Sequence, residues 1–233
     1  SIGSKMEGSN MSKRLKKVIT TAVFMMLFCI CSINAFAASN KKVSALYKTF
    51  MTKKTVKISD TYKKSVTLKD CYFTTIDIDG NGIKELIVKE KFGNSSFWTC
   101  SPGTYIFTVK NNKVIYTGNT CLKQDTTATV QISKKYKAIF SCYPVASYTP
   151  AYFYTLKNGK LSCKMFFYAQ YGYPDGKLGN IPHEEWCKKV GYYINKKTVT
   201  QKKYHTEYNK YKKTLKKYKL YKNTASNRKK ILK

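Results

Sequence analysis

One short segment of the chain, IDIDGNGIKELIV at residues 76–88, is strongly acidic although the protein has only 12 acidic residues in total. It gathers four oxygen-bearing side chains around two glycines: Asp77, Asp79, Asn81, Glu85, Gly80 and Gly82. Oxygen atoms at alternate positions of a short loop are how proteins bind hard cations such as calcium. The three carboxylates would repel one another without a cation. The alternative is a sharp turn whose Asp and Asn side chains bond only to their own backbone.

The spacing within this segment predicts a specific set of calcium ligands. Counting Asp77 as position one, carboxylates fall at one and three, an amide oxygen at five and Glu85 at nine. Gly82 permits a sharp turn, and the Ile83 carbonyl contributes at position seven. An EF-hand would need a bidentate Glu at position twelve, where this chain has Val88. We therefore expect a weak site (roughly 10⁻⁴ to 10⁻³ M) outside the EF-hand class, which braces a hairpin and carries no chemistry.

Alternating apolar residues predict that strands position this loop. CYFTTIDID reads as a strand, the acidic segment as its turn and KELIVKEKF as the returning strand. Two later segments, YIFTVKNNKV at 105–114 and YFYTLKNGKL at 152–161, share a pattern and carry Asn-Asn or Asn-Gly at a two-residue turn. We expect two similar hairpins in one antiparallel sheet. GYYINKKTVT at 191–200 predicts one further short strand.

Helical spacing occurs on either side of these strands. KKVSALYKTFMTKK at 41–54 predicts a short amphipathic helix. Thr200 can cap a second, basic helix over QKKYHTEYNKYKKTLKKYKLYK, with aromatic or apolar residues three or four apart: Tyr204, Tyr208, Tyr211, Leu215 and Tyr218. The segment 201–233 is thus expected to be a Lys/Tyr-rich helical tail. Either its lysines lie on an anionic surface, or its tyrosines pack on the sheet with solvated lysines outside; we favour the packed interpretation for the tyrosines.

The amino-terminal region predicts export from the cell. From Met11, a basic head, an apolar run from Val18 to Ile33 and a small-residue pattern follow in the order of a secretory signal peptide, which predicts cleavage after Ala37. The apolar run is short for a membrane span, which needs roughly 20 residues. Residues 1–10 are an upstream extension or a cloning scar. We expect residues 11–37 to be the signal peptide and residues 38–233 a single secreted α+β domain. Its expected fold is an antiparallel sheet of hairpins with a short amino-terminal helix and a basic carboxy-terminal helix.

The charge balance predicts attraction to polyanions. The chain has 44 Lys and Arg against 12 Asp and Glu, for a net charge of +32. In an extracellular setting, the expected partners are an anionic cell-wall polymer or a membrane surface, with retention at the cell wall. Specific nucleic-acid binding is not expected, and we expect a monomer. Because Arg14 and Arg228 are the only arginines, AT-rich codon usage is a competing explanation for the lysines.

Six cysteines lie beyond the predicted signal peptide: Cys71, Cys100, Cys121, Cys142, Cys163 and Cys187. An even number in an exported chain predicts up to three disulfides. Cys100 and Cys121 lie at nearly mirrored positions about the 105–114 hairpin, so we expect them to pair. Free, buried cysteines are the alternative.

The pattern D-x-D-G-N-G-x-x-E-L before a strand resembles the calcium loops of FG-GAP (integrin-type) repeats. It is similar also to uncharacterised secreted proteins of low-GC Gram-positive bacteria, which combine a signal peptide, one such loop, Y-x-K-N-G-K hairpins and a closing Y-x-I-N-x-K-x-V segment. The resemblance implies Asp77, Asp79, Asn81 and Glu85 as side-chain ligands and Ile83 as a carbonyl ligand. Asn81 departs from the preferred Asp, which should weaken the site, as should Lys84 and Lys89 nearby. The resemblance implies no activity.

We therefore expect a secreted, non-enzymatic binding or structural protein with a calcium-braced hairpin, associated with the anionic cell envelope. A small hydrolase is one alternative, in which His183 with Glu184 or Glu185 would supply acid/base chemistry. A basic effector that acts on anionic membranes is another. Trp98, Trp186 and the tyrosines could also form a sugar-stacking face, although aromatic residues in strands more often belong to the core.

Overall fold

The computed structural model describes residues 18–19, 40–60, 64–90, 103–120, 128–142, 148–171 and 190–233. The chain divides into two compact units, Ser1–Lys42 and Val43–Lys233. In the first unit the described residues are helical, and Val18 and Ile19 are 65% and 54% exposed. The predicted cleavage point after Ala37 lies outside the described residues. The second unit holds every strand described in the chain.

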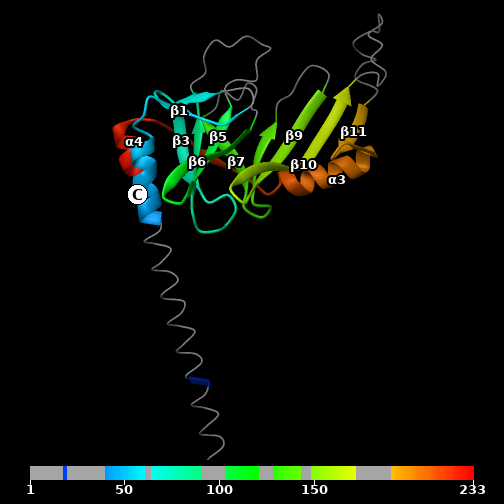
Figure 1. The fold of residues 1–233 in the computed structure, drawn as a ribbon. Coiled ribbons are helices and arrows are strands. Elements are labelled where there is room, and N and C mark those ends of the chain that lie inside the picture. The colour runs from blue at the N-terminus through cyan, green and yellow to red at the C-terminus, as the bar shows by residue number, and fades with distance from the viewer. Residues whose placement is uncertain are drawn as a thin grey trace, which may run out of the picture. The chain divides into compact units, whose positions relative to one another are not determined.

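The second unit is built mainly of antiparallel strands with short helices, consistent with an α+β protein (Figure 1). The strands are β1 (Thr55–Lys57), β2 (Ser65–Thr67), β3 (Tyr72–Ile76), β4 (Glu85–Lys89), β5 (Thr104–Lys110), β6 (Lys113–Thr120), β7 (Thr129–Ser133), β8 (Ala138–Cys142), β9 (Tyr148–Lys157), β10 (Lys160–Tyr171), β11 (Val190–Ile194), β12 (Lys197–Val199), β13 (Leu215–Lys219) and β14 (Tyr221–Lys222). The helices are residues 40–50, α3 (Gln201–Lys212) and α4 (Ala225–Ile231).

The strands form three sheets. A five-stranded sheet has the order β14-β3-β4-β5-β6, and a seven-stranded sheet has the order β12-β11-β10-β9-β8-β7-β13. β1 and β2 make a separate two-stranded sheet. The acidic segment connects β3 to β4, as the alternating pattern predicted, so it lies at one end of the five-stranded sheet.

Turn chemistry sets the register of the hairpins. Asn111 and Asn112 between β5 and β6 both have positive φ angles, of 50° and 58°. Asn158 and Gly159 between β9 and β10 have φ angles of 52° and 74°. These are the conformations that a tight two-residue hairpin turn requires, and Asn and Gly adopt them more readily than other residues. Both predicted hairpins are confirmed.

The two similar hairpins do not share a sheet, however, and that prediction was wrong. The β5–β6 hairpin belongs to the five-stranded sheet, and the β9–β10 hairpin belongs to the seven-stranded sheet. They meet where Gly118 of β6 faces Leu161 of β10: a Cβ atom added to Gly118 would lie 2.7 Å from the Leu161 Cβ. Each hairpin thus belongs to its own sheet and packs against the hairpin of the other sheet. The sequence pattern of a single hairpin does not specify this packing.

Three clusters of buried side chains hold the elements of the second unit together. The outer core lies between residues 43–51, the β1–β2 sheet and one face of the five-stranded sheet. The inter-sheet core lies between the two larger sheets and is formed by Ile76, Ile78, Ile87, Ile106, Val130, Ile132, Ile139 and Leu220. The α3 core lies between α3 and the other face of the seven-stranded sheet. Burying these apolar faces is the main favourable contribution to folding.

The predicted amino-terminal helix is confirmed over residues 40–50. Its apolar residues recur every three to four positions, so Val43, Tyr47 and Phe50 share one face, and all three are buried in the outer core with Met51. Phe50 packs on Phe107 of the five-stranded sheet with a ring separation of 5.0 Å. This helix therefore covers the sheet face opposite the inter-sheet core.

The carboxy-terminal segment is not the single helix that its spacing predicted. Helix α3 begins after Thr200, whose side chain accepts the Lys203 amide as predicted, and it ends at Lys212. The chain then continues as β13 beside β7 and as β14 beside β3, before α4 begins after Thr224.

Helix α3 ends at Lys212 because the apolar residues that follow it pack against two different cores. Leu215 packs against the α3 core, whereas Tyr218, three residues on, packs against the inter-sheet core. Residues three apart share a helix face but lie on opposite faces of a strand. Strand pairing with β7 gives each side chain its own core and covers the edge of β7. Tertiary pairing therefore overrides the helical spacing beyond Lys212.

The tyrosine stripe of α3 packs on the sheet, as the packed interpretation predicted. Tyr204 and Tyr211 are buried in the α3 core. Phe167 of β10 is the centre of their contacts and also meets Tyr208 edge-on at 5.4 Å. Tyr211 stacks on Tyr136 with 4.1 Å between the ring centres. The lysines of α3 are left on the outer side of the helix.

The segment 191–200 contains two strands instead of the one predicted. Asn195 and Lys196 adopt φ angles of 49° and 67°, so the chain turns there and β12 returns along β11. The Asn195 side chain accepts the Phe166 amide at 2.8 Å, which ties this turn to β10.

Replacing Gly118 by Ala should destabilise the contact between the two sheets. Gly118 has a φ of 147° and no room for a Cβ beside Leu161. We expect a loss of roughly 1–3 kcal/mol in the free energy of unfolding, measured by chemical denaturation. Gly103→Ala is the matched control because its added Cβ would meet neighbours at an ordinary 3.5 Å. Equal effects of the two substitutions would contradict this account of the interface.

Candidate metal centre

The acidic loop between β3 and β4 is organised around the Asp77 carboxylate. One carboxylate oxygen accepts the Gly80 amide at 2.6 Å, and the other accepts the Gly82 amide at 3.0 Å. Gly80 and Gly82 have φ angles of 73° and 87°, which glycine adopts without steric cost. These conformations turn the two amides toward Asp77. The loop is therefore ordered by its own backbone donors, as the turn interpretation predicted.

The next two polar residues also bond within the loop. Asp79 accepts both the backbone amide and the side-chain amide of Asn81, each at 3.1 Å. The Asn81 side-chain oxygen accepts the Ile83 amide at 2.7 Å. Asn81 is exposed, whereas Asp77 and Asp79 are partly buried. A cation bound through Asn81 would have to compete with the Ile83 amide, so this residue is the weakest of the predicted ligands.

Glu85 differs from the other acids because it is fully buried, at 0% exposure. One carboxylate oxygen accepts the Ile78 amide at 2.8 Å, and the other lies 3.4 Å from the Thr108 hydroxyl of β5. Burial raises the pKa of Glu85 to about 7, and the nearby charges of Asp79 and Asp77 act in the same direction. The Ile78 amide opposes this shift because it stabilises the charged form.

Three of the five predicted ligands converge. Each of Asp77, Asp79 and Glu85 offers a carboxylate oxygen, and these oxygens lie within 4.8 Å of one another. Within the described ranges this is the only group of three or more acidic, histidine or cysteine side chains placed to share a metal ion. The carbonyl role of Ile83 stays a prediction; its side chain packs against the outer core. An all-oxygen donor set of this charge suits a hard cation such as calcium.

Lysines from the seven-stranded sheet also lie at the loop, and sequence reasoning missed them. The Lys134 ammonium donates to the Asp77 carbonyl. The end of the Lys137 side chain lies 3.2 Å from the position that a Cβ at Gly80 would take. Both belong to the turn between β7 and β8, more than 50 residues along the chain from the loop. Nothing in the local pattern of either segment indicates this meeting.

Lys89, which was expected to weaken the site, lies away from it. It pairs with Tyr72 at the opposite end of the β3–β4 hairpin, whereas Glu85 pairs with Ile76 beside the loop. Lys84 is exposed within the loop. The positive charge near the carboxylates therefore comes from Lys84 and from the β7–β8 turn.

The amino-terminal helix supports the loop from the other side. The Tyr47 hydroxyl lies 3.0 Å from the Lys84 carbonyl and 3.3 Å from the Phe107 carbonyl, so it links the helix, the loop and β5. Burial and the charge of Glu85 raise the pKa of this hydroxyl, which keeps it a hydrogen-bond donor. Glu85 is thus enclosed by β3, β5 and the helix.

Several other predicted residues lie outside the described ranges: Cys100, Cys121, Cys187, Trp98, Trp186, His183, Glu184 and Glu185. The Cys100–Cys121 pairing and the acid/base alternative at His183 therefore stay predictions. The three described cysteines, Cys71, Cys142 and Cys163, form no disulfide. Burial raises the pKa of all three, that of Cys71 to about 12, so they are not activated as nucleophiles. His205 is exposed on α3 and lies edge-on to Tyr192 and Tyr204.

The chain matches no protein-family model, and it has no significant match among curated proteins or solved structures. In the part of the chain that the structure describes, none of the helices combines the length and apolar character needed to span a membrane. The loop geometry is therefore the main guide to function.

Stability in the presence of a metal chelator should depend on pH through Glu85. The folded chain holds this proton up to about pH 7, but at its ordinary pKa of 4.5 the unfolded chain releases it much earlier. The resulting stability is complete below pH 4.5 and is lost as pH rises through about 7, by up to roughly 3 kcal/mol.

Glu85→Gln retains the shape and removes this titration. The measurement is the free energy of unfolding of both proteins between about pH 4 and 8, a range that contains the ordinary pKa of 4.5 and the folded pKa of about 7. Wild type should lose stability relative to Glu85→Gln as pH rises. A difference that is constant across this range would contradict the role of Glu85.

Proposed function

We propose that the protein is a secreted, non-enzymatic binding or structural protein whose β3–β4 hairpin is braced by calcium and whose basic surface binds an anionic polymer of the cell envelope. The observation that carries this proposal is the convergence of Asp77, Asp79 and Glu85 within 4.8 Å, with Glu85 fully buried. The resemblance of the loop to secreted calcium-loop proteins agrees with it but implies no activity.

Charge favours a cation at this loop. Three carboxylates repel one another, and a buried carboxylate is costly unless it is protonated or paired. A calcium ion would replace the proton on Glu85 and balance Asp77 and Asp79 at the same time. It would tie the end of β3 to the start of β4, because these acids lie on either side of the turn. The Lys134 and Lys137 side chains would compete with it, which supports a weak site.

The environment of the loop favours bracing over catalysis. The carboxylates already accept backbone amides, which orients them. The open hollow that Asp79 adjoins is otherwise lined by lysines and neutral residues. The described histidine, His205, packs against Tyr192 and Tyr204 at the α3 core instead of at the loop. The hydrolase alternative would have to use residues outside the described ranges.

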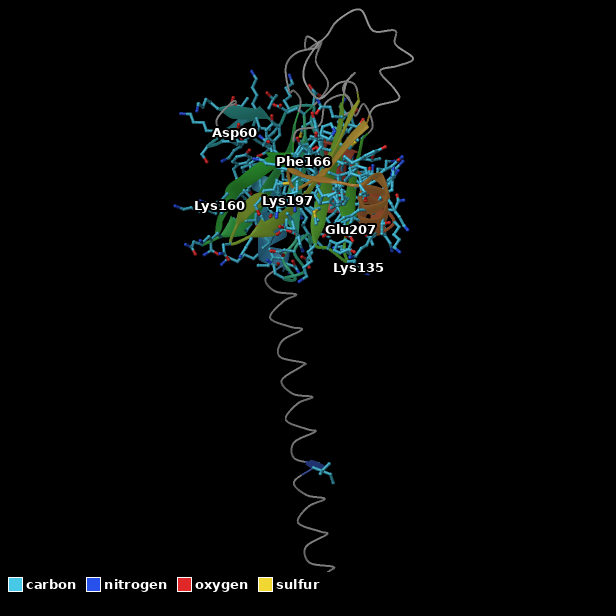
Figure 2. All side chains as sticks on the ribbon, turned by 90° about the vertical axis from the view of Figure 1, so that its right-hand side faces the viewer. Asp60, Lys135, Lys160, Phe166, Lys197 and Glu207 are labelled. Atoms are coloured by element: carbon cyan, nitrogen blue, oxygen red, sulfur yellow. The ribbon has the colours of Figure 1, made fainter. Side chains whose placement is uncertain are left out.

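The surface supports attachment to a polyanion. Nitrogen-tipped side chains project from the left, lower and right sides of the folded unit, with Lys160 and Lys135 among the labelled residues (Figure 2). With a net charge of +32, the protein attracts anionic polymers over a distance set by ionic strength. The lysine face of α3 contributes to this attraction, while its tyrosines are occupied with packing.

Calcium at millimolar concentration should raise the melting temperature of the protein. A calcium concentration about ten times the dissociation constant stabilises the folded protein by roughly 1.4 kcal/mol. For a domain of this size, this raises the melting temperature by about 3 °C. Asp79→Asn should abolish the shift because it removes one ligand charge. Asp70→Asn removes the same charge outside the loop and should keep the shift. The proposal fails for calcium if wild type shows no shift, or if Asp79→Asn shows the same one.

Binding to purified cell walls should fall steeply with salt. We expect strong retention at about 0.05 M salt and loss at about 0.5 M, because the Debye length shortens over this range. Walls from which the anionic polymers have been extracted should bind little even at low salt. Retention that is insensitive to salt, or equal on the extracted walls, would contradict the electrostatic part of the proposal.

A further inference from the structure

We propose that the surface around Arg228, where α4 meets the end of the amino-terminal helix, binds the phosphates of a phosphodiester polymer. This inference rests on the proposed attachment to an anionic envelope polymer and names where that polymer binds. We call this region the Arg228 surface: Arg228 with Lys48, Lys53, Lys54, Lys69 and Lys229.

The guanidinium of Arg228 is held in place by a built network. Its Nη1 donates to the Asn223 side-chain oxygen at 2.8 Å. Asn223 in turn donates its side-chain amide to the carbonyls of Met51 at 3.0 Å and Leu68 at 2.8 Å, and its backbone amide to Cys71. Asn223 thus joins three separate segments of the chain. A guanidinium fixed in this way loses less freedom when it binds a ligand.

Two open hollows adjoin Arg228, of about 420 and 400 Å³, and both are lined by Arg228 and Thr52. Lys48 and Lys229 line the first, and Lys53, Lys54 and Lys69 line the second. These five lysines are exposed. Asp70 is the acid among the described lining residues, and its carboxylate lies 3.9 Å from the Lys222 ammonium. Five lysines therefore surround a partly buried, positioned guanidinium.

Arg228 gives this surface a donor geometry that its lysines do not have. Arg228 is the only arginine in the second unit, whose other cations are lysines. Its planar fork of donors matches two oxygens of one phosphate, whereas lysine acts as a point charge. The same fork also matches a carboxylate, so binding to polyglutamate is the measurement that separates the two polymers.

The lining residues favour a flexible polymer over a membrane or a nucleic acid. Hollows on both sides of Arg228 suit successive phosphates of one chain. Among the described lining residues none is aromatic, so bases would find no stacking partner. Met51, the large apolar side chain among them, is only 1% exposed, so nothing here would insert into lipid.

The test measures binding of the full chain to poly(glycerol phosphate) at low salt by calorimetry. Arg228→Gln should weaken binding about tenfold, and Arg228→Lys should also weaken it although the charge is kept. Lys54→Gln/Lys69→Gln, which changes exposed side chains only, should weaken it similarly. Lys110→Gln/Lys113→Gln removes the same charge from exposed positions outside the surface and should have less than about a twofold effect. Melting temperatures report whether Arg228→Gln still folds.

Each result bears on a different part of the proposal. Equal losses in the two double variants would overturn the Arg228 surface but leave the proposed electrostatic attachment standing. Absence of binding to any polyanion would overturn both. Equal affinity of wild type and Arg228→Lys, or tighter binding to polyglutamate, would overturn the choice of phosphate. Tighter binding to oligothymidylate or to anionic lipid vesicles, reduced by Arg228→Gln, would assign the surface to those partners and overturn the polymer.

Discussion

The arrangement of the second unit depends on a short piece of chain that is hydrogen-bonded to both large sheets. Strand β13 adds to the edge of the seven-stranded sheet beside β7, and β14 adds to the edge of the five-stranded sheet beside β3. Between them Leu220 is 1% exposed in the inter-sheet core, and its amide donates to the Ala128 carbonyl at 2.7 Å. Because β3 ends at the acidic loop, this crossing also determines which lysines of the other sheet face the carboxylates.

Local chemistry was enough to predict the Asn111-Asn112 and Asn158-Gly159 turns, the Thr200 cap, the amino-terminal helix and the β3–β4 hairpin. Each depends on residues close in sequence, such as Asn158-Gly159 at a tight turn or Val43 and Tyr47 on one helix face. The division into two sheets and the end of α3 at Lys212 could not be predicted, because both depend on which core each side chain meets. The convergence of Asp77, Asp79 and Glu85 was predictable from their spacing, but the approach of Lys134 and Lys137 was not.

The acidic loop can be neutralised in three ways, and the structure holds parts of each. A proton favours Glu85, an ammonium group approaches Asp77 from the β7–β8 turn, and a divalent cation would suit all three carboxylates. These are alternatives for the same negative charge. The loop therefore couples the state of the β3–β4 hairpin to the position of the neighbouring sheet, since the ammonium groups belong to that sheet.

The position of Asn223 has a consequence for the order of folding. This residue bonds to Met51, 172 residues earlier in the chain, and it follows directly after the strand that completes the five-stranded sheet. A growing chain therefore cannot add this edge strand to the five-stranded sheet until residue 222 has been synthesised. Contacts this distant in sequence make folding slow, because the loop must be closed before the contact is gained. Until then the β3 edge of the five-stranded sheet lacks its neighbouring strand.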